Sequence, residues 1–190
     1  MGVTPKRLVF LASGRGSNFE AIARAIQAGE LQAEASALIC NRREAPVLKI
    51  AEGLGVPACL VDRKRFKDRL AYEEELISMI ETFDPDLVCL AGYMLLLGPK
   101  VVQRWKGKIV NIHPSLLPDF RGLNAQKQAL ESGRSETGCT VHYVTEGLDD
   151  GPIIEQSKIA ILPGDTEQSL SERLLAVEHA TYVRALRKIL

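Results

Sequence analysis

Apolar positions along the chain form short continuous runs that alternate with longer, spaced patterns. Compact apolar runs at residues 7–12, 35–40 and 87–91 predict buried strands, and shorter runs at 57–61 and 109–112 predict two more. Residues 87–91 contain no polar side chain, which is typical of a parallel strand covered on both faces. The pattern therefore predicts a sheet with several buried strands in the first two thirds of the chain.

The segments between these strands show apolar residues at helical spacing. The first segment follows a glycine-containing turn, and we expect Ser17 or Asn18 to cap its helix. Further helices are expected at residues 45–54 and 99–105, the second being a short turn.

Residues 66–83 have the clearest amphipathic pattern. It predicts a helix that buries Leu70 with the other apolar residues of its stripe and turns Glu73 and Glu74 outward. Pro85 ends this helix, because a proline cannot continue the helical hydrogen bonding.

The pattern of apolar and polar residues changes beyond residue 112. Polar and apolar residues alternate at 140–144, and isoleucines recur across 153–161 after a Gly-Pro break, which predicts strands that could be antiparallel or at an edge. A last helix, capped by Asp165 or Thr166, runs to the end of the chain.

Strand and helix alternate at least four times along the sequence. This order predicts an α/β fold with a mostly parallel twisted sheet, helices on both faces and later strands that could be antiparallel. Because no repeat, low-complexity tract or linker interrupts residues 1–190, we expect a single domain.

Composition narrows the classes of function. The chain has 24 Lys and Arg against 24 Asp and Glu, which excludes a nucleic-acid binder that relies on a broadly basic body. No run approaches the roughly 18 apolar residues of a membrane span, and no cleavable leader is recognisable, so we expect a cytoplasmic protein without membrane contact. A local anion pocket remains compatible with a neutral body.

The cysteines and histidines suggest no metal. Four cysteines, at positions 40, 59, 89 and 139, form no CxxC pair and no zinc-type spacing with a histidine. Three of them lie in apolar stretches, where a free thiol behaves as a small hydrophobic side chain. We expect reduced, structural thiols and no bound metal.

In such a sheet, ligands bind beyond the carboxyl ends of the strands, and the first loop there favours a phosphate. The backbone N–H groups of Gly16, Ser17 and Asn18 stand at a helix start, where they can bind an anion. The alternative is a plain strand-to-helix turn. A dinucleotide fingerprint would need glycine in place of Phe19 and an acidic residue after the second strand, so NAD is not expected.

The second loop leaves the strand at residues 109–112. Asn111 and His113 are two residues apart in an extended segment, so both side chains point to the same side. An amide N–H can stabilise an oxyanion, and an imidazole moves protons near neutral pH. A histidine at a strand end can also be structural, but Pro114 and Pro118 stiffen the loop and favour a functional position.

Later polar residues leave more alternatives open. Asp149 and Asp150 precede a Gly-Pro turn, where an aspartate often bonds the backbone two residues on. His142 lies in an alternating strand and His179 on the last helix, and either can be structural. Glu178 is either a solvated helix charge or a side chain facing the crevice.

Six motifs together carry a family resemblance. In chain order they are GRGSN at 14–18, AGYM at 91–94, NIHPSLLP at 111–118, GCTVHYV at 138–144, LDDGP at 148–152 and VEHATY at 177–182. Over residues 7–188 the chain resembles the glycinamide ribonucleotide formyltransferase family. The resemblance implies a single domain with a Rossmann-like formyltransferase fold. Residues 1–105 would bind the ribonucleotide phosphate, and residues 106–190 would bind folate and catalyse the reaction.

The resemblance implies that 10-formyltetrahydrofolate, as co-substrate, donates its formyl group to the amine of 5-phosphoribosylglycinamide in de novo purine biosynthesis. Direct amine attack forms a tetrahedral intermediate, so neither a metal nor a covalent nucleophile is required. Asn111 would be the oxyanion donor, His113 the general acid and Asp149 the orienting group or proton acceptor.

The resemblance also assigns binding residues. Gly16, Ser17 and Asn18 would hold the ribonucleotide phosphate, and Glu178 the amine end of the glycinamide. The residues expected to line the folate site are Arg69, Met94, Leu95, Leu96, Leu97, Asn111, Thr145, Glu146, Gly147, Leu148 and Asp149.

Three departures from the family pattern stand out. No basic residue directly follows Met94, and Asn124 stands where some members carry histidine. The chain stops at Leu190, where many relatives continue, and we expect no catalytic loss from this.

Two other functions remain open. A 10-formyltetrahydrofolate deformylase would use the same Asn, His and Asp, with water in place of the amine. It usually has an extra N-terminal domain, for which we expect no room, and a formyltransferase acting on initiator transfer RNA would need a further basic domain. A non-catalytic folate- or nucleotide-binding module is the second alternative. The partners expected are small molecules, and the protein would be a monomer or homodimer.

Overall fold

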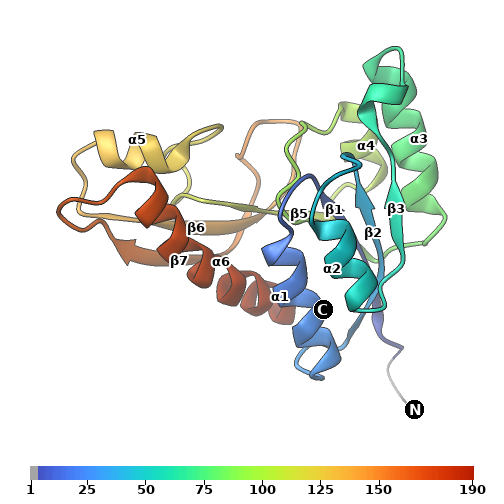
Figure 1. Cartoon of the computed structure of the whole chain (residues 1–190), viewed down its shortest axis with the longest axis horizontal. Helices are drawn as coiled ribbons and strands as arrows, with labels where there is room; N and C mark the ends of the chain where they lie inside the picture. The colour runs from blue at the N-terminus through green and yellow to red at the C-terminus, as the bar shows by residue number, and fades with distance from the viewer. Residues whose placement is uncertain (1–3) are drawn as a thin grey trace.

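The structure, a computed structural model, describes residues 4–190 and contains one seven-stranded sheet with the strand order β3-β2-β1-β4-β5-β6-β7 (Figure 1). The strands are β1 Lys6–Ala12, β2 Ala33–Cys40, β3 Ala58–Leu60, β4 Leu87–Leu90, β5 Ile109–His113, β6 Glu136–Tyr143 and β7 Ile153–Ala160. The first five strands in chain order pair in parallel, whereas β6 and β7 run antiparallel to their neighbours. The predicted mixed sheet of a single α/β domain is confirmed.

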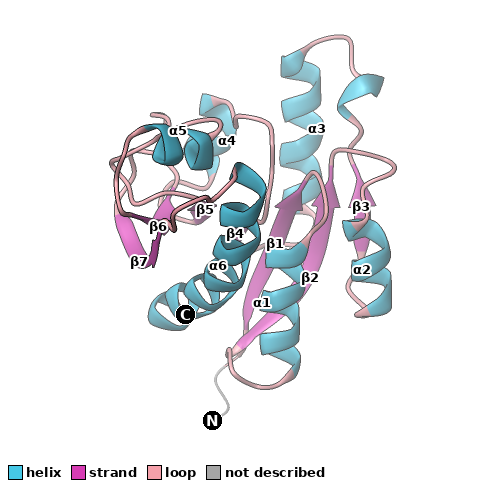
Figure 2. Ribbon diagram, turned by 60° about the vertical axis from the view of Figure 1, so that its left-hand side comes forward, coloured by secondary structure: helices cyan, strands magenta, loops and turns pink. Residues whose placement is uncertain are grey.

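Helices cover both faces of this sheet (Figure 2). They are α1 Ser17–Gln27, α2 Val47–Gly53, α3 Arg69–Glu81, α4 Pro99–Arg104, α5 Ala125–Glu131 and α6 Glu167–Ile189, with a 3-10 turn η1 Arg63–Arg65. Core residues from α1, α2 and α6 pack on one face, and core residues from α3 and α4 pack on the other. The short helix α5 contacts α6 and β6, and its weak apolar pattern gave no prediction.

The position of strand β1 between two layers of helices explains why its sequence is continuously apolar. Leu8 and Phe10 belong to the core on the α1 and α6 side, whereas Val9 and Leu11 belong to the core on the α3 side. All four side chains are fully buried. A strand with helices on both faces has no solvent side, so period-two alternation disappears.

Helix α3 differs from its prediction in both its start and its buried face. It begins at Arg69 rather than near residue 66, because the Asp68 side chain accepts a hydrogen bond from Ala71 N at 2.8 Å and caps it. Glu73, expected outward, is buried, and Leu70, expected inward, is 50% exposed. An ion pair with Arg69 and the packing of Gly98 account for the burial of Glu73.

The two predicted helix caps had different outcomes. Thr166 caps α6, where its hydroxyl accepts from Ser169 N at 3.1 Å. At α1 the prediction was wrong, because the cap position is Gly16 and neither Ser17 nor Asn18 caps the helix. Gly16 has a φ of 87°, and a β-carbon there would lie 2.3 Å from Val47 Cγ2, so a tight glycine turn starts the helix.

Candidate active site

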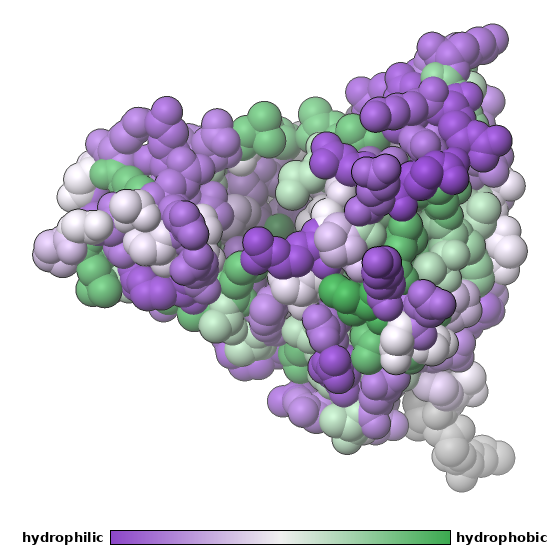
Figure 3. Space-filling view, viewed as in Figure 1, coloured by the Kyte–Doolittle hydropathy of each residue, from purple (hydrophilic) through white to green (hydrophobic). Residues whose placement is uncertain are grey.

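The parallel strands β1, β4 and β5 are neighbours in the sheet, so the loops that follow their carboxyl ends lie at one edge. Ser13, just after β1, is bonded to the loop after β4 through Ser13 N to Gly92 O at 3.1 Å and Met94 N to Ser13 Oγ at 2.8 Å. The surface is hollowed between the part that carries α5 and the part that carries α3 (Figure 3). This edge is where ligands of open α/β sheets bind.

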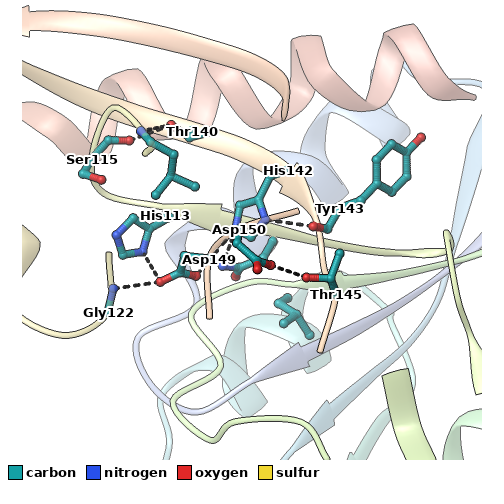
Figure 4. A network of polar contacts seen from close by, with 12 residues as sticks. His113, Ser115, Gly122, Thr140, His142, Tyr143, Thr145, Asp149 and Asp150 are labelled. Atoms are coloured by element: carbon teal, nitrogen blue, oxygen red, sulfur yellow. Dashed lines mark hydrogen bonds and ion pairs between the residues drawn. The ribbon is translucent and has the colours of Figure 1, made fainter. Parts of the chain in front are cut away.

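His113 and Asp149 meet at the end of β5 (Figure 4). His113 Nδ1 lies 3.3 Å from Asp149 Oδ2, and His113 Nε2 lies 2.9 Å from the Phe120 carbonyl oxygen. Both ring nitrogens therefore face oxygen acceptors, an arrangement that the doubly protonated imidazolium satisfies completely. Gly122 N donates to the same Asp149 oxygen at 2.9 Å.

His142 joins this group, although the sequence gave it no functional role. Its Nε2 lies 3.6 Å from Asp149 Oδ1 and 3.3 Å from Asn111 Nδ2. Asn111 and His142 are register partners in the antiparallel pairing of β5 and β6. In the sequence, His142 is a polar residue at an alternating position of a buried strand. Only the register of β5 and β6 shows that it faces Asn111.

Asp149 is held as a carboxylate. Burial opposes its ionisation, but the His142 hydrogen bond, the Gly122 N–H and the charges of both imidazoles together lower its pKa. Its backbone φ is 47°, in the left-handed region that non-glycine residues adopt rarely. Asp149 therefore has a strained backbone and a fully engaged side chain, a combination that is common at functional sites.

A buried hydrogen-bond network holds the loop that follows His113. The Thr140 hydroxyl donates to Ser115 O at 2.7 Å and accepts from Leu117 N at 3.0 Å. Gln156 Nε2 donates to the Leu117 carbonyl oxygen at 2.9 Å. Because Thr140 is fully buried, these bonds fix the loop to β6 and β7 and so limit the positions that His113 can take.

The residues predicted for the ribonucleotide come together around the start of α1. The backbone N–H groups of Gly16, Ser17 and Asn18 have no acceptor within residues 4–190, as expected for the first turn of a helix. Asn18 Nδ2 donates to Glu178 Oε2 at 2.9 Å. Glu178 is only 7% exposed, and burial raises its pKa against the opposing effect of the Asn18 bond.

An open pocket of about 420 Å³ borders this region. Its lining comes from the loop before α1, from α5 and from α6, and comprises Arg15, Ser17, Gln126, Gln168, Ser171, Glu172, Leu175 and Glu178. The volume suits a small polar molecule. The side chain of Glu178 thus faces the crevice, one of the two possibilities left by the sequence.

Most of the residues predicted for folate come from two loops, one after β4 and one after β6, and Arg69 and Asn111 come from α3 and β5. Met94 and Leu96, after β4, are 65% and 68% exposed, and Arg69 donates to Leu96 O at 3.2 Å. Glu146 belongs to the loop after β6, and it accepts from Gln103 at 3.0 Å, which bonds this loop to α4. The other members have varied exposure: Leu95, Leu97 and Thr145 are half-buried, and Gly147 and Leu148 are exposed.

Four further features named in the sequence analysis lie outside this cluster. Cys40, Cys89 and Cys139 are buried and Cys59 is half-buried, and all four are free thiols. Within residues 4–190 no group of three or more metal-binding side chains is arranged to hold an ion, so the absence of a metal stays a prediction. None of the helices in that range is long and apolar enough to cross a bilayer. Asn124 occupies the N-cap position of α5 with a φ of 58°, and its side chain makes no capping hydrogen bond.

Comparison with known proteins places these motifs in a family. The chain is 40% identical over 185 residues to the phosphoribosylglycinamide formyltransferase of Bacillus subtilis, covering 97% of this chain and 95% of the relative. The crystal structure of glycinamide ribonucleotide transformylase 1 from Geobacillus kaustophilus superposes with a TM-score of 0.94 at 45% identity, covering 98% and 99% of the two chains.

Other relatives are longer. A formyltetrahydrofolate deformylase from Pseudomonas syringae has a TM-score of 0.90 at 30% identity, covering 96% of this chain and 60% of the deformylase. The chain spans only 13% to 18% of the length of three multifunctional curated relatives. Residues 6–186, nearly the whole chain, match the Formyl transferase family. The chain therefore belongs to the formyl transferase family.

Proposed function

We propose that the protein transfers the formyl group of 10-formyltetrahydrofolate to the amine of 5-phosphoribosylglycinamide, a step of purine biosynthesis. The observation that carries the proposal is the contact between His113 and the ionised Asp149 beside Asn111, at the carboxyl edge of the sheet. Relatives named for this reaction match nearly the whole chain. The two parts of the chain have different roles: residues 1–105 bind the ribonucleotide phosphate, and residues 106–190 provide catalysis and most of the folate contacts.

The reaction proceeds by direct attack of the amine on the formyl carbon. A new C–N bond forms and the formyl oxygen becomes an oxyanion, which the Asn111 amide and the His113 imidazolium stabilise. The bond from the formyl carbon to N10 then breaks, and His113 delivers a proton to the departing N10. Asp149 orients the imidazolium and accepts, through water, the proton that the attacking amine loses.

Binding follows from the two flanking regions. The free N–H groups of Gly16, Ser17 and Asn18 take the substrate phosphate, because unpaired donors at a helix start favour an anion. Glu178 faces the amine end of the glycinamide. The folate lies along the exposed Met94 to Leu97 segment and the Thr145 to Asp149 loop, with Arg69 as the cation beside them.

The test is formation of free tetrahydrofolate when the protein is mixed with both substrates. We expect product only when the ribonucleotide and the formyl folate are both present. Equal release of tetrahydrofolate without the ribonucleotide would identify a deformylase. One structural relative, from Pseudomonas syringae, is a formyltetrahydrofolate deformylase.

His113 is the residue on which the mechanism depends most. His113→Ala should lower the rate at least about 10²-fold, because the proton donor to N10 is lost. His179→Ala is the matched control, since that half-buried histidine lies on α6 outside the catalytic cluster. A rate unaffected by His113→Ala would remove His113 from the mechanism. A native protein that binds folate but transfers no formyl group would instead be a binding module.

A further inference from the structure

The loop from Gly92 to Gly98 has a fixed backbone but exposed apolar side chains. Met94 N is bonded to Ser13 Oγ at 2.8 Å, and Leu96 O accepts from Arg69 Nη2 at 3.2 Å. The Met94 and Leu96 side chains are nevertheless 65% and 68% exposed. Large apolar side chains exposed on a fixed backbone offer a preformed surface to an apolar ligand.

The far end of this loop rests on a buried carboxylate. Glu73 of α3 is 6% exposed, and its Oε1 lies 2.5 Å from Arg69 Nε. A β-carbon built on Gly98 would lie 2.0 Å from Glu73 Oε2. The carboxylate therefore packs directly against the Gly98 backbone, and a larger residue at position 98 would displace it.

The arrangement fixes Arg69 as well as the loop. Its Nε is held by Glu73 and its Nη2 by the Leu96 carbonyl, so the planar guanidinium cannot rotate freely. The Arg69 side chain remains 56% exposed, which leaves its outer donors accessible. Burying a charge is costly unless it is paired, and an apolar residue at position 73 could fill the same space. Burial of the Glu73 carboxylate therefore depends on the orientation of Arg69, which is also the orientation that bonds the loop.

We propose that Glu73 is a positioning residue for the folate co-substrate. It holds Arg69 and the Met94 to Leu97 segment in the geometry that binds folate, without touching either substrate. The inference rests on the proposed function, because that function places Arg69 and this segment in the folate site. It adds a residue of α3 that neither the sequence motifs nor the catalytic cluster includes.

The experiment is steady-state kinetics of Glu73→Gln with each substrate varied in turn. We expect the KM for the formyl folate to rise about tenfold, the size of a lost coupling within one ion-pair network. The kcat and the KM for the ribonucleotide should change less than twofold. Glu74→Gln is the matched control: Glu74 is an adjacent carboxylate on α3, exposed and paired with Lys100 at 3.4 Å, and its loss should leave all three constants unchanged.

A second variant covers the case in which Glu73→Gln does not fold. Gly98→Ala places a methyl group where the carboxylate lies, so it should raise the folate KM selectively by the same route. The inference is overturned if either folded variant leaves the folate KM unchanged, or raises both KM values equally.

Calorimetric titration with a non-reactive folate analogue separates this inference from the proposed function. If the native protein binds the analogue but transfers no formyl group, the proposed function fails. Weaker analogue binding by Glu73→Gln would then still support its positioning role. If transfer occurs but both proteins bind the analogue equally, only the positioning role fails.

Discussion

Asp149 and Glu178 are two mostly buried carboxylates near the same edge of the sheet, and their surroundings shift their pKa values in opposite directions. Asp149 contacts two imidazoles and accepts from the Gly122 N–H, and its pKa is lowered. Glu178 has one amide partner, Asn18, and burial raises its pKa. Asn18 itself keeps a buried Oδ1 with no partner among the described residues.

The contrast shows that burial alone does not decide the charge of a carboxyl group. Desolvation disfavours the ionised form at both positions, and the number of donors and cations decides which effect wins. Around Asp149 these partners come from the protein, so the catalytic cluster is organised in advance. Around Glu178 the protein supplies a single donor, so its ionised form gains most from a further polar or cationic partner.

The largest expected effect is that of removing the charge at Asp149. Asp149→Asn places an amide NH₂ where the carboxylate accepts from His113, His142 and Gly122, so at least one donor faces another donor. We expect kcat to fall at least about 10²-fold. Asp150→Asn is the control, because Asp150 is exposed and bonds Thr145 rather than either histidine (Figure 4). Equal kcat values for the two variants would contradict a special role for Asp149.

The same change at Glu178 should affect binding rather than turnover. Glu178→Gln keeps an oxygen to accept from Asn18 but removes the charge facing the pocket. We expect the KM for the ribonucleotide to rise about tenfold, the value of a hydrogen bond to a charged group, with kcat changed less than threefold. Glu167→Gln, on the exposed first turn of α6, should change neither constant. A fall in kcat without a change in KM would show that Glu178, like Asp149, acts in turnover and not in binding.

Much of the fold and part of the site could be predicted from local patterns. The parallel strands are continuous apolar runs, and the polar loops at their carboxyl ends can be read directly from the residues that follow them. Asn111 and His113 are two positions apart in one strand, so their common side follows from strand geometry alone. Such predictions depend on neighbours within a few residues.

The features that could not be predicted depend on distant parts of the chain. His142 joins the catalytic cluster because the antiparallel register sets it opposite Asn111, and no local pattern specifies that register. Glu73 is buried because Gly98, 25 positions further along the chain, packs on its carboxylate. A charged side chain on an amphipathic helix is predicted to be exposed unless its tertiary partner is known.

The smallest expected effect, and the most direct test of the contrast, is the pH dependence of stability. The side chain of an unfolded glutamate has a pKa of about 4.3. Because the folded pKa of Glu178 is raised, the native state of the wild type loses stability as pH rises from there through the folded pKa. Glu178→Gln lacks this loss, so its Tm relative to wild type should increase over that window.

Asp149→Asn should show the opposite trend. The folded pKa of Asp149 is lowered, so its ionised form stabilises the wild type above the unfolded value of about 3.9, and this stabilisation disappears as pH falls through the folded pKa. The Tm of Asp149→Asn relative to wild type should therefore decrease as pH rises. Melting curves of the three proteins from pH 3 to pH 7 measure both differences. Parallel trends would show that the two carboxylates share one environment, because only opposite pKa shifts make the differences diverge with pH.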